Sequence, residues 1–182
     1  MSQTASRVSV RRATAADAAA LHDVAAVTFP LACTPNTPEE EKAAHIAEHL
    51  SEAVFAHQLA EPARILLLAL SDGEPAGYSM LLRGEPVDAD VAAAIRIRPT
   101  IELVRMYVLP GHHGSGIAST LMTATLDAAR DTGAAGVWLG VSEENDRANA
   151  FYARHGFERV GMKRFHIGDR WEDDFVRERS LR

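Results

Sequence analysis

The chain has 182 residues, of which 47% are hydrophobic and 24% charged, and its net charge is −6. This length suits one domain with its own core, and the negative charge argues against nucleic acid as the main partner. The single cysteine, Cys33, excludes an internal disulfide and suits a reducing cytoplasm. The sequence has no run of about 18 apolar residues, so we expect no membrane span. We therefore expect a cytoplasmic globular protein with no membrane partner.

In chain order, the first half of the sequence predicts a strand over residues 8–12 and helices over 14–30, 37–50 and 51–61. Residues 64–82 predict two strands joined by a Ser-Asp-Gly-Glu turn, which is a hairpin. The nine-residue segment PLACTPNTP between the first two helices contains three prolines. It should therefore form a stiff, irregular loop.

The stretch from Thr100 to Ala129 carries the strongest local signals. Residues 100–108 alternate as a strand does. The expected faces are Ile101, Leu103 and Tyr107 on one side and Glu102, Val104, Met106 and Val108 on the other. Pro110 and three glycines within the next six positions end this strand in a tight loop, and apolar spacing from Ala118 predicts a helix. Because a glycine loop before a helix directs free N–H groups and a positive dipole end outward, we expect an anion to bind there.

The rest of the sequence completes one mixed α/β domain. A strand is predicted over residues 136–141, a helix over 143–155 and a final hairpin over 159–181. No internal repeat, low-complexity tract or linker divides the chain. We expect a single domain over residues 8–181, preceded by a short tail, residues 1–7.

The glycine loop departs from two other phosphate-binding patterns. A Walker loop needs Lys and then Ser or Thr after its last glycine, where this chain has Ile117 and Ala118. A dinucleotide-binding loop needs a third glycine three positions after Gly116, where this chain has Ser119. A tight turn that needs glycine only for its backbone is the other interpretation. On spacing alone, an anion site and a structural turn both stay open.

Metal and nucleophile patterns elsewhere in the chain are weaker. HIAEH at residues 45–49 matches the H-x-x-E-H pattern of one zinc-protease class, but no downstream glutamate partner is identifiable, and His112–His113 has no supporting cluster. We therefore expect no metal. Cys33 lacks the His–acid pattern of an activated nucleophile. The run Glu39–Glu41 suits either a solvated helix start or attraction of a cationic substrate.

Two stretches resemble motifs of a known enzyme superfamily. YVLPGHHGSGIASTLM resembles motif A of the GNAT superfamily of acetyl-CoA-dependent N-acetyltransferases, with His113 where the family usually has Arg or Gln. NDRANAFYARHGF resembles motif B of the same superfamily. The resemblance implies a central mixed, largely antiparallel sheet of about six to seven strands with helices on both faces. Its two central strands would splay apart and hold acetyl-CoA.

The resemblance also implies where acetyl-CoA binds. The pyrophosphate would rest on backbone amides of residues 113–118, where glycine allows close approach. The pantetheine arm would run beside Met106–Val108, and residues of motif B would complete the site. The implied cofactor-binding residues are Met106, Tyr107, Val108, His113, Gly114, Ser115, Gly116, Ile117, Ala118, Asn145, Ala148 and Tyr152.

Catalytic roles follow from the same resemblance. Glu102 occupies the superfamily's frequent general-base position and would deprotonate the acceptor amine through a water; an ordinary strand-end carboxylate is the alternative. The amide of Val108, expected on the same strand face as Glu102, would polarise the thioester carbonyl. Tyr152 would protonate the departing thiolate, with simple packing as its alternative. The amine would attack acetyl-CoA directly in a ternary complex.

A narrower resemblance concerns the acceptor. The segments IELVRMYV and WLGVSEEN resemble the Pai-type bacterial polyamine acetyltransferases. They imply a small-molecule primary amine as substrate, with Phe29, Pro30 and Glu102 at its site. Acetylation of protein N-termini or lysines is one alternative, and a non-catalytic acetyl-CoA-binding regulator is another. The presence of both Glu102 and Tyr152 argues against the regulator, and the superfamily's frequent dimers allow a homodimer.

Overall fold

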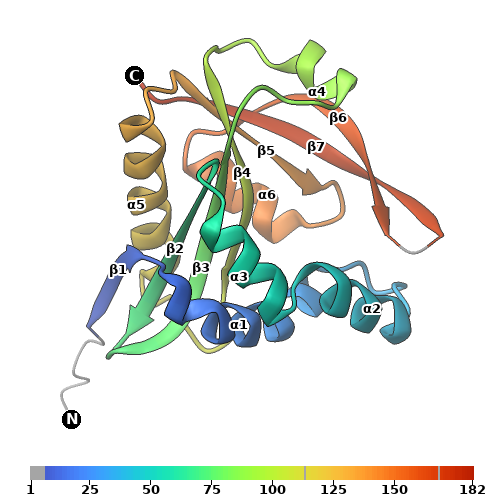
Figure 1. The fold of residues 1–182 in the computed structure, drawn as a ribbon. Helices are drawn as coiled ribbons and strands as arrows, with labels where there is room; N and C mark the ends of the chain where they lie inside the picture. Colours follow the sequence, from blue (N-terminus) through green and yellow to red (C-terminus); the bar gives the residue numbers. More distant parts are fainter. Residues whose placement is uncertain (1–6, 113, 168) are drawn as a thin grey trace.

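A computed structural model describes residues 7–112, 114–167 and 169–182. These residues form a seven-stranded sheet in the order β1-β2-β3-β4-β5-β7-β6 (Figure 1). The strands are β1 (Val8–Arg12), β2 (Arg64–Ser71), β3 (Glu74–Arg83), β4 (Thr100–Val108), β5 (Gly136–Ser142), β6 (Glu158–Ile167) and β7 (Arg170–Ser180). All neighbouring pairs are antiparallel except β4 and β5, which run parallel. The mixed, largely antiparallel sheet confirms the predicted fold class.

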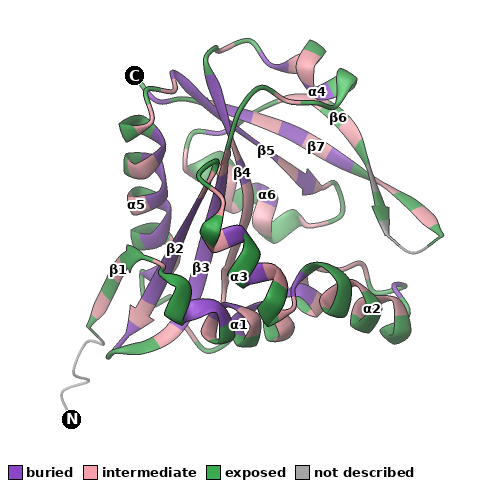
Figure 2. Ribbon diagram, in the orientation of Figure 1, coloured by how far each residue is buried: buried purple, intermediate pink, exposed green. Residues whose placement is uncertain are grey.

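Helices cover both faces of this sheet (Figure 1). They are the 3-10 helix η1 (Ala15–Asp17), α1 (Ala18–Ala32), α2 (Glu39–His49), α3 (Glu52–Ala60), α4 (Ala89–Ala94), α5 (Ile117–Asp131) and α6 (Asp146–Arg154). One core joins α5 and α6 to the sheet around Leu121 and Phe157. A second core joins α1 and α3 to the other face around Leu21 and Phe55. In Figure 2 the buried residues follow the central strands and the inward sides of these helices.

The first helix is longer than its sequence predicts. The predicted capping box is present, because Thr14 and Asp17 bond reciprocally at the start of η1. The predicted end near Pro30 is wrong, since α1 continues through Pro30 to Ala32. Proline removes one helical hydrogen bond, but it lies in the last turn and directly follows the buried Phe29. Packing of that turn therefore outweighs one missing bond.

A bulge in β4 changes which side chains share a face. Met80 pairs with Arg105 and Leu81 with Leu103, so Val104 is an extra residue without a partner on β3. Beyond the bulge, the alternation is shifted by one position. The α5 face carries Ile101, Leu103, Met106 and Val108, and the α1 face carries Val104, Tyr107 and Leu109. The predicted common face of Glu102 and Val108 is therefore wrong, because alternation from Ile101 and Leu103 puts Glu102 on the α1 face.

The two central strands pair over a short distance only. The β4–β5 register joins Thr100 to Gly136, Ile101 to Val137 and Glu102 to Trp138, and it ends there. The remainder of β4 pairs with β3 alone. Its other edge has no strand partner beyond Glu102, so β4 and β5 separate there and leave a gap, as expected of the splayed central strands that the resemblance implies.

Part of the predicted organisation falls outside the described residues. Of the predicted tail, only Arg7 is described, and its amide donates to the Asp72 carboxylate at 2.8 Å. His113 in the glycine loop is likewise not among the residues that the structure describes. Within the described ranges, none of the helices has the length and apolar character needed to cross a bilayer.

Candidate active site

Three glycines lie in the loop between β4 and α5. Gly111, Gly114 and Gly116 all have positive φ values, of 89°, 83° and 81°, a region that L side chains avoid. A Cβ at any of the three would meet no atom within 4 Å, so the space above them is open. Gly116 is the N-cap of α5, whose first N–H groups lack helical partners. The loop therefore has the form of an anion-binding cradle.

Backbone N–H groups of β4 point into the gap opposite β5. The amide of Leu109 donates to the carbonyl of Ala76 on β3 at 2.8 Å. Since N–H directions alternate along a strand, the amides of Val108 and Met106 point to the opposite edge, away from β3. That edge has no strand partner beyond Glu102. Both amides are therefore donors toward whatever occupies the gap.

Helix α6 places Tyr152 on the same face of the sheet as the cradle. The ring of Tyr152 contacts those of Phe151 and Phe157, with centroid distances of 5.6 and 5.7 Å. Burial, and to a smaller extent the neighbouring Tyr107, raise the pKa of the Tyr152 hydroxyl above its usual value. The hydroxyl is therefore protonated at neutral pH and able to donate.

The start of α6 is held by two asparagines, of which sequence reasoning identified one. Asn145 caps the helix by accepting from the amide of Ala148 at 3.0 Å. Buried Asn149 donates to the carbonyls of Ser142 and Asn145, at 2.9 and 3.0 Å, and accepts from Arg177 Nε at 2.9 Å. It therefore connects the end of β5 to α6 and β7. Its only sequence signal is a polar residue at an inward-facing helical position.

Glu102 lies on the α1 face in a region of reduced solvent contact. Burial raises the pKa of its carboxyl above the usual value, and Lys163, Arg64 and Arg105 partly oppose that rise. Within the described residues, one guanidinium nitrogen of Arg105 is buried without a hydrogen-bond partner. A partly buried carboxyl with a raised pKa is a candidate proton acceptor.

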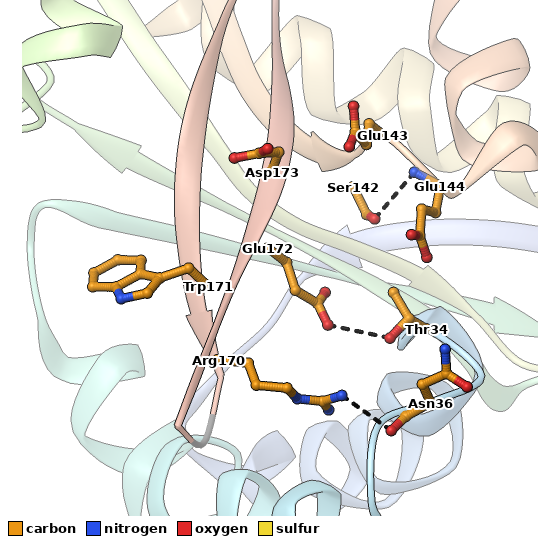
Figure 3. A pocket seen from close by; sticks show the side chains of 9 residues that line it. All are labelled: Thr34, Asn36, Ser142, Glu143, Glu144, Arg170, Trp171, Glu172 and Asp173. Carbon is orange, nitrogen blue, oxygen red and sulfur yellow. Dashed lines mark hydrogen bonds between the residues drawn. The ribbon is translucent and has the colours of Figure 1, made fainter.

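A pocket of about 210 Å³ opens beside the carboxyl end of β5 (Figure 3). It is lined by Thr34, Asn36, Ser142, Glu143, Glu144, Arg170, Trp171, Glu172 and Asp173. Thr34 donates to Glu172 at 3.1 Å and Arg170 to the carbonyl of Asn36 at 3.1 Å, which joins the α1–α2 loop to the β6–β7 hairpin. Figure 3 shows Trp171 pointing away from the other side chains. Four carboxylates against one guanidinium make the pocket acidic.

A second pocket of about 130 Å³ adjoins the first and shares Thr34, Ser142 and Glu144 with it. The segment of α1 and its loop that lines it runs from Leu31 to Pro35. Phe29 and Pro30, the predicted acceptor residues, come just before that segment. Phe29 is buried and stacks on His45 with a centroid distance of 4.3 Å. The structure thus brings the loop after these residues to the pocket, rather than Phe29 and Pro30 themselves.

The remaining candidate side chains lie against packed or charged neighbours. Burial lowers the pKa of His45, which lies against His49, to about 4. Burial likewise raises the pKa of the Cys33 thiol to about 11, and its sulfur donates to the carbonyl of Phe29. Glu41 lies 3.3 Å from Arg170, so its charge is partly compensated. In the described ranges, no group of three or more His, Cys, Asp and Glu side chains is arranged to hold a metal ion.

Comparison with known proteins decides the family. A model of the acetyltransferase (GNAT) family matches residues 27–157. The chain belongs to this family. It is therefore an acetyl-CoA-dependent N-acetyltransferase, as the two motifs predict.

Individual relatives agree with the family assignment. This acetyltransferase is 44% identical over 165 residues to an uncharacterized N-acetyltransferase of Mycobacterium tuberculosis, covering 91% of this chain and 98% of the relative. It is 34% identical over 115 residues to the N-alpha-acetyltransferase RimI of that organism, covering 62% and 63%. Its fold matches the crystal structure of PaiA N-acetyltransferase from Thermoplasma acidophilum in complex with coenzyme A, with a TM-score of 0.75, 20% identity and coverage of 96% and 99%.

Proposed function

We propose that this acetyltransferase transfers the acetyl group of acetyl-CoA to a primary amine of a small cationic molecule, with polyamine-like acceptors favoured. The observation that carries the proposal is the acidic pocket beside the carboxyl end of β5, the strand that no longer pairs with β4 at that end. An acceptor that enters there would reach the gap from the α1 face of the sheet, which we call the acceptor face. The glycine cradle and Tyr152 belong to the opposite face.

The gap and the cradle fit acetyl-CoA, which supplies an acetyl group activated as a thioester. The amides of residues 113–118 would hold its pyrophosphate, since Gly114 and Gly116 leave the space above them open. The amides of Met106 and Val108 are directed at the gap and would bind the pantetheine arm and the thioester oxygen. The site would be completed at the starts of α5 and α6 by Ser115, Ile117, Ala118, Asn145 and Ala148.

Two side chains would move the protons. An acceptor amine arrives as an ammonium with a pKa of about 10, so it must lose a proton before it attacks. Glu102, on the acceptor face, would take that proton through a water. Tyr152, whose hydroxyl stays protonated, would donate to the departing thiolate. The amine nitrogen then attacks the acetyl carbon directly, and no covalent enzyme intermediate is needed.

The charge of the pocket favours polyamines over amines that carry a single positive charge. Glu143 and Glu144 from the β5–α6 loop face Glu172 and Asp173 from β7. A polyamine carries further ammonium groups beyond the reacting one, and each can contact a carboxylate of this set. Phe29 and Pro30 would support the pocket from the end of α1.

A second candidate is acetylation of protein N-termini. It is favoured by the 34% identity to RimI, which is named an N-alpha-acetyltransferase. A peptide would need room for several residues beyond the amine, and the pocket of about 210 Å³ suits a smaller acceptor. A homodimer and a cytoplasmic location complete the proposal; the single cysteine is consistent with that compartment.

Acetyl-CoA consumption tests the acceptor class directly. We expect turnover with spermidine and spermine that exceeds turnover with amino acids, aminoglycosides and N-terminal peptides. Glu144→Gln should lower kcat/KM for spermidine by about fivefold while leaving that for butylamine, which has a single charge, nearly unchanged. Turnover of peptides alone would replace the proposal with the second candidate. Tight binding of acetyl-CoA without turnover of any amine would favour a regulatory protein.

A further inference from the structure

A lysine from β6 extends over β7 and reaches β5 on the acceptor face of the sheet. Lys163 pairs with Asp174 in the β6–β7 register, and Gly140 of β5 lies next to both. A Cβ built on Gly140 would lie 2.4 Å from Lys163 Cε, 3.2 Å from its Nζ and 3.3 Å from Asp174 Oδ2. Glycine at this position is therefore what allows the lysine stem to pass. The ammonium lies 5.9 Å from the centroid of the Trp138 ring, toward β4.

Asp174 is a buried carboxylate that the mechanism above does not use. The residue is 8% exposed, and within the described ranges its side chain has neither a hydrogen bond nor an ion pair inside 4 Å. Its oxygens are not among the side-chain atoms that are fully buried without a partner, so water reaches the carboxylate. A largely buried titratable group next to the pocket-lining Asp173 is a candidate functional residue. The titratable groups that face it are Lys163 on β6, Tyr107 on β4, and Glu172 and Asp173 on its own strand.

The sheet register places Asp174 nearer the pocket than Glu102. Glu102 is level with Trp138 on β5, whereas Asp174 is level with Ser142, which lines both pockets. Four residues of strand separate these levels by about 13 Å. The backbone amide of Val108 is six residues beyond Glu102, a span of about 20 Å before the bulge shortens it. A proton acceptor level with Ser142 would therefore lie nearer an amine that enters from the pocket than Glu102 does.

We propose that Asp174 is a second proton acceptor for the acceptor amine, and that Lys163 is a positioning residue which joins Asp174 and Glu102 into one charged cluster. The inference rests on the proposed function of the acidic pocket. The ammonium of the acceptor would give its proton to the Asp174 carboxylate, directly or through a water. The free amine then attacks the acetyl carbon, so that the C–N bond forms and the C–S bond of the thioester breaks. The Tyr152 hydroxyl protonates the departing thiolate and regains a proton from the second N–H of the attacking nitrogen, and the Asp174 proton passes to solvent.

Electrostatics agree with this geometry. Burial is the main cause that raises the pKa of Asp174 to about 6; Lys163 opposes the rise, and the nearby Glu172 and Asp173 add to it. Among the charges, Lys163 also has the largest lowering effect on the pKa of Glu102. Removing the lysine charge should therefore raise both pKa values together.

The first experiment measures kcat/KM against pH for Asp174→Asn, with an amine that the wild-type enzyme acetylates. We expect a loss of about tenfold to a hundredfold at neutral pH, with KM for acetyl-CoA unchanged. Glu158→Gln, which removes an exposed carboxylate of β6 far from the pocket, is the matched control. Thermal unfolding checks that the variants fold. A wild-type-like profile for Asp174→Asn, measured with an amine that is turned over, overturns the inference but leaves the proposed function standing.

The second experiment needs no turnover and so separates the inference from the acceptor class. Carboxyl carbon NMR of protein labelled at Asp and Glu follows the titration of each carboxyl group. The titration midpoints of Asp174 and Glu102 should move to higher pH in Lys163→Met. Gly140→Ala should act in the same direction, because its Cβ displaces the flexible lysine stem. Lys163→Arg, which keeps the charge, should restore the wild-type midpoints. Midpoints that stay in place in Lys163→Met contradict the proposed cluster.

Discussion

Glu102 and Met106 point to opposite faces of β4 although they are four positions apart, an even spacing that would put them on one face of a regular strand. The bulge at Val104 shifts the alternation by one position between them. As a result, one strand presents a carboxylate to the acceptor face and apolar side chains to the face that holds α5. The backbone edge between the two faces carries the amides that point into the gap. A single extra residue thus divides β4 into an acceptor half and a cofactor half.

Glu102→Gln tests the general base through pH dependence. Activity requires the ionised carboxylate, so it is lost as pH falls through the pKa, and burial moves that pKa upward. We expect the amide variant to lose about tenfold to a hundredfold in kcat/KM at neutral pH and to change the acidic limb of the profile. Glu74→Gln, an exposed glutamate of β3, is the control. An acidic limb identical to wild type would remove Glu102 from the mechanism.

Tyr152→Phe tests the proposed acid. The substitution keeps the ring contacts with Phe151 and Phe157 and removes only the hydroxyl. We expect kcat to fall by about tenfold to a thousandfold, with a change of less than about threefold in KM for acetyl-CoA. Tyr78→Phe is the matched control, because its buried hydroxyl has no partner among the described residues and belongs to the other core. Equal losses in kcat and affinity would instead indicate a packing role for Tyr152.

Gly116→Ala tests the anion cradle. Gly116 and Gly73 have similar positive φ values, of 81° and 88°, and a Cβ at either position would meet no atom within 4 Å. Both alanine variants should therefore lose about 1 kcal/mol of unfolding free energy through backbone strain. Only Gly116→Ala should raise KM for acetyl-CoA, since Gly73 lies in the β2–β3 turn. The prediction fails if the two variants change KM alike. Chemical denaturation and steady-state kinetics on the same preparations provide both measurements.

Asp17→Asn tests the start of α1 and its dependence on pH. The Arg11 guanidinium bonds both carboxylate oxygens at 2.8 Å and the Thr14 amide donates at 2.7 Å, which holds the pKa of Asp17 well below its usual value. A carboxyl with a lowered pKa in the folded state stabilises above its unfolded pKa of about 3.9, and this contribution is lost as pH falls. We expect the variant to cost about 1 to 2 kcal/mol at pH 7, mainly through the cap, since Arg11 is half exposed.

The control for that variant is Asp127→Asn, which breaks an exposed ion pair with Arg130 on α5. It should change the unfolding free energy by less than about 0.5 kcal/mol at either pH. Urea denaturation at pH 7 and pH 3 measures both variants. A cost for Asp17→Asn that is the same at the two pH values would show that its charge does not contribute.

Local patterns in the sequence were sufficient for most of the fold. The strand at residues 8–12 and the buried face of α5 are as predicted, because alternation and helical spacing report burial directly. The bulge at Val104 was not predictable from that pattern, because valine suits either face and the extra residue is defined only by pairing with β3. The helix end at Pro30 was predicted wrongly for a related reason. Tertiary packing of the last turn of α1 outweighed the tendency of proline to end a helix.

The candidate site likewise contains residues that the sequence predicts and residues that it does not. The cradle glycines and Tyr152 belong to contiguous motifs, so one sequence is enough to propose them. Lys163 and Asp174 come from β6 and β7, and only the register of three strands brings them together over Gly140. The spacing of these residues along the chain does not predict that they lie close together. The acceptor pocket likewise joins Thr34 to Glu172, which are 138 positions apart.

The short β4–β5 ladder has a consequence for the stability of the whole molecule. Three residue pairs connect the antiparallel unit β1–β4 to the antiparallel unit β5–β7–β6. A ligand in the gap would bond to both units and would supply part of the connection that the sheet lacks. Acetyl-CoA would then be a structural component as well as a reactant. The free energy of unfolding should rise with the logarithm of its concentration above Kd, and hydrogen exchange should slow at the amides of Met106 and Val108 together with those at the end of β5.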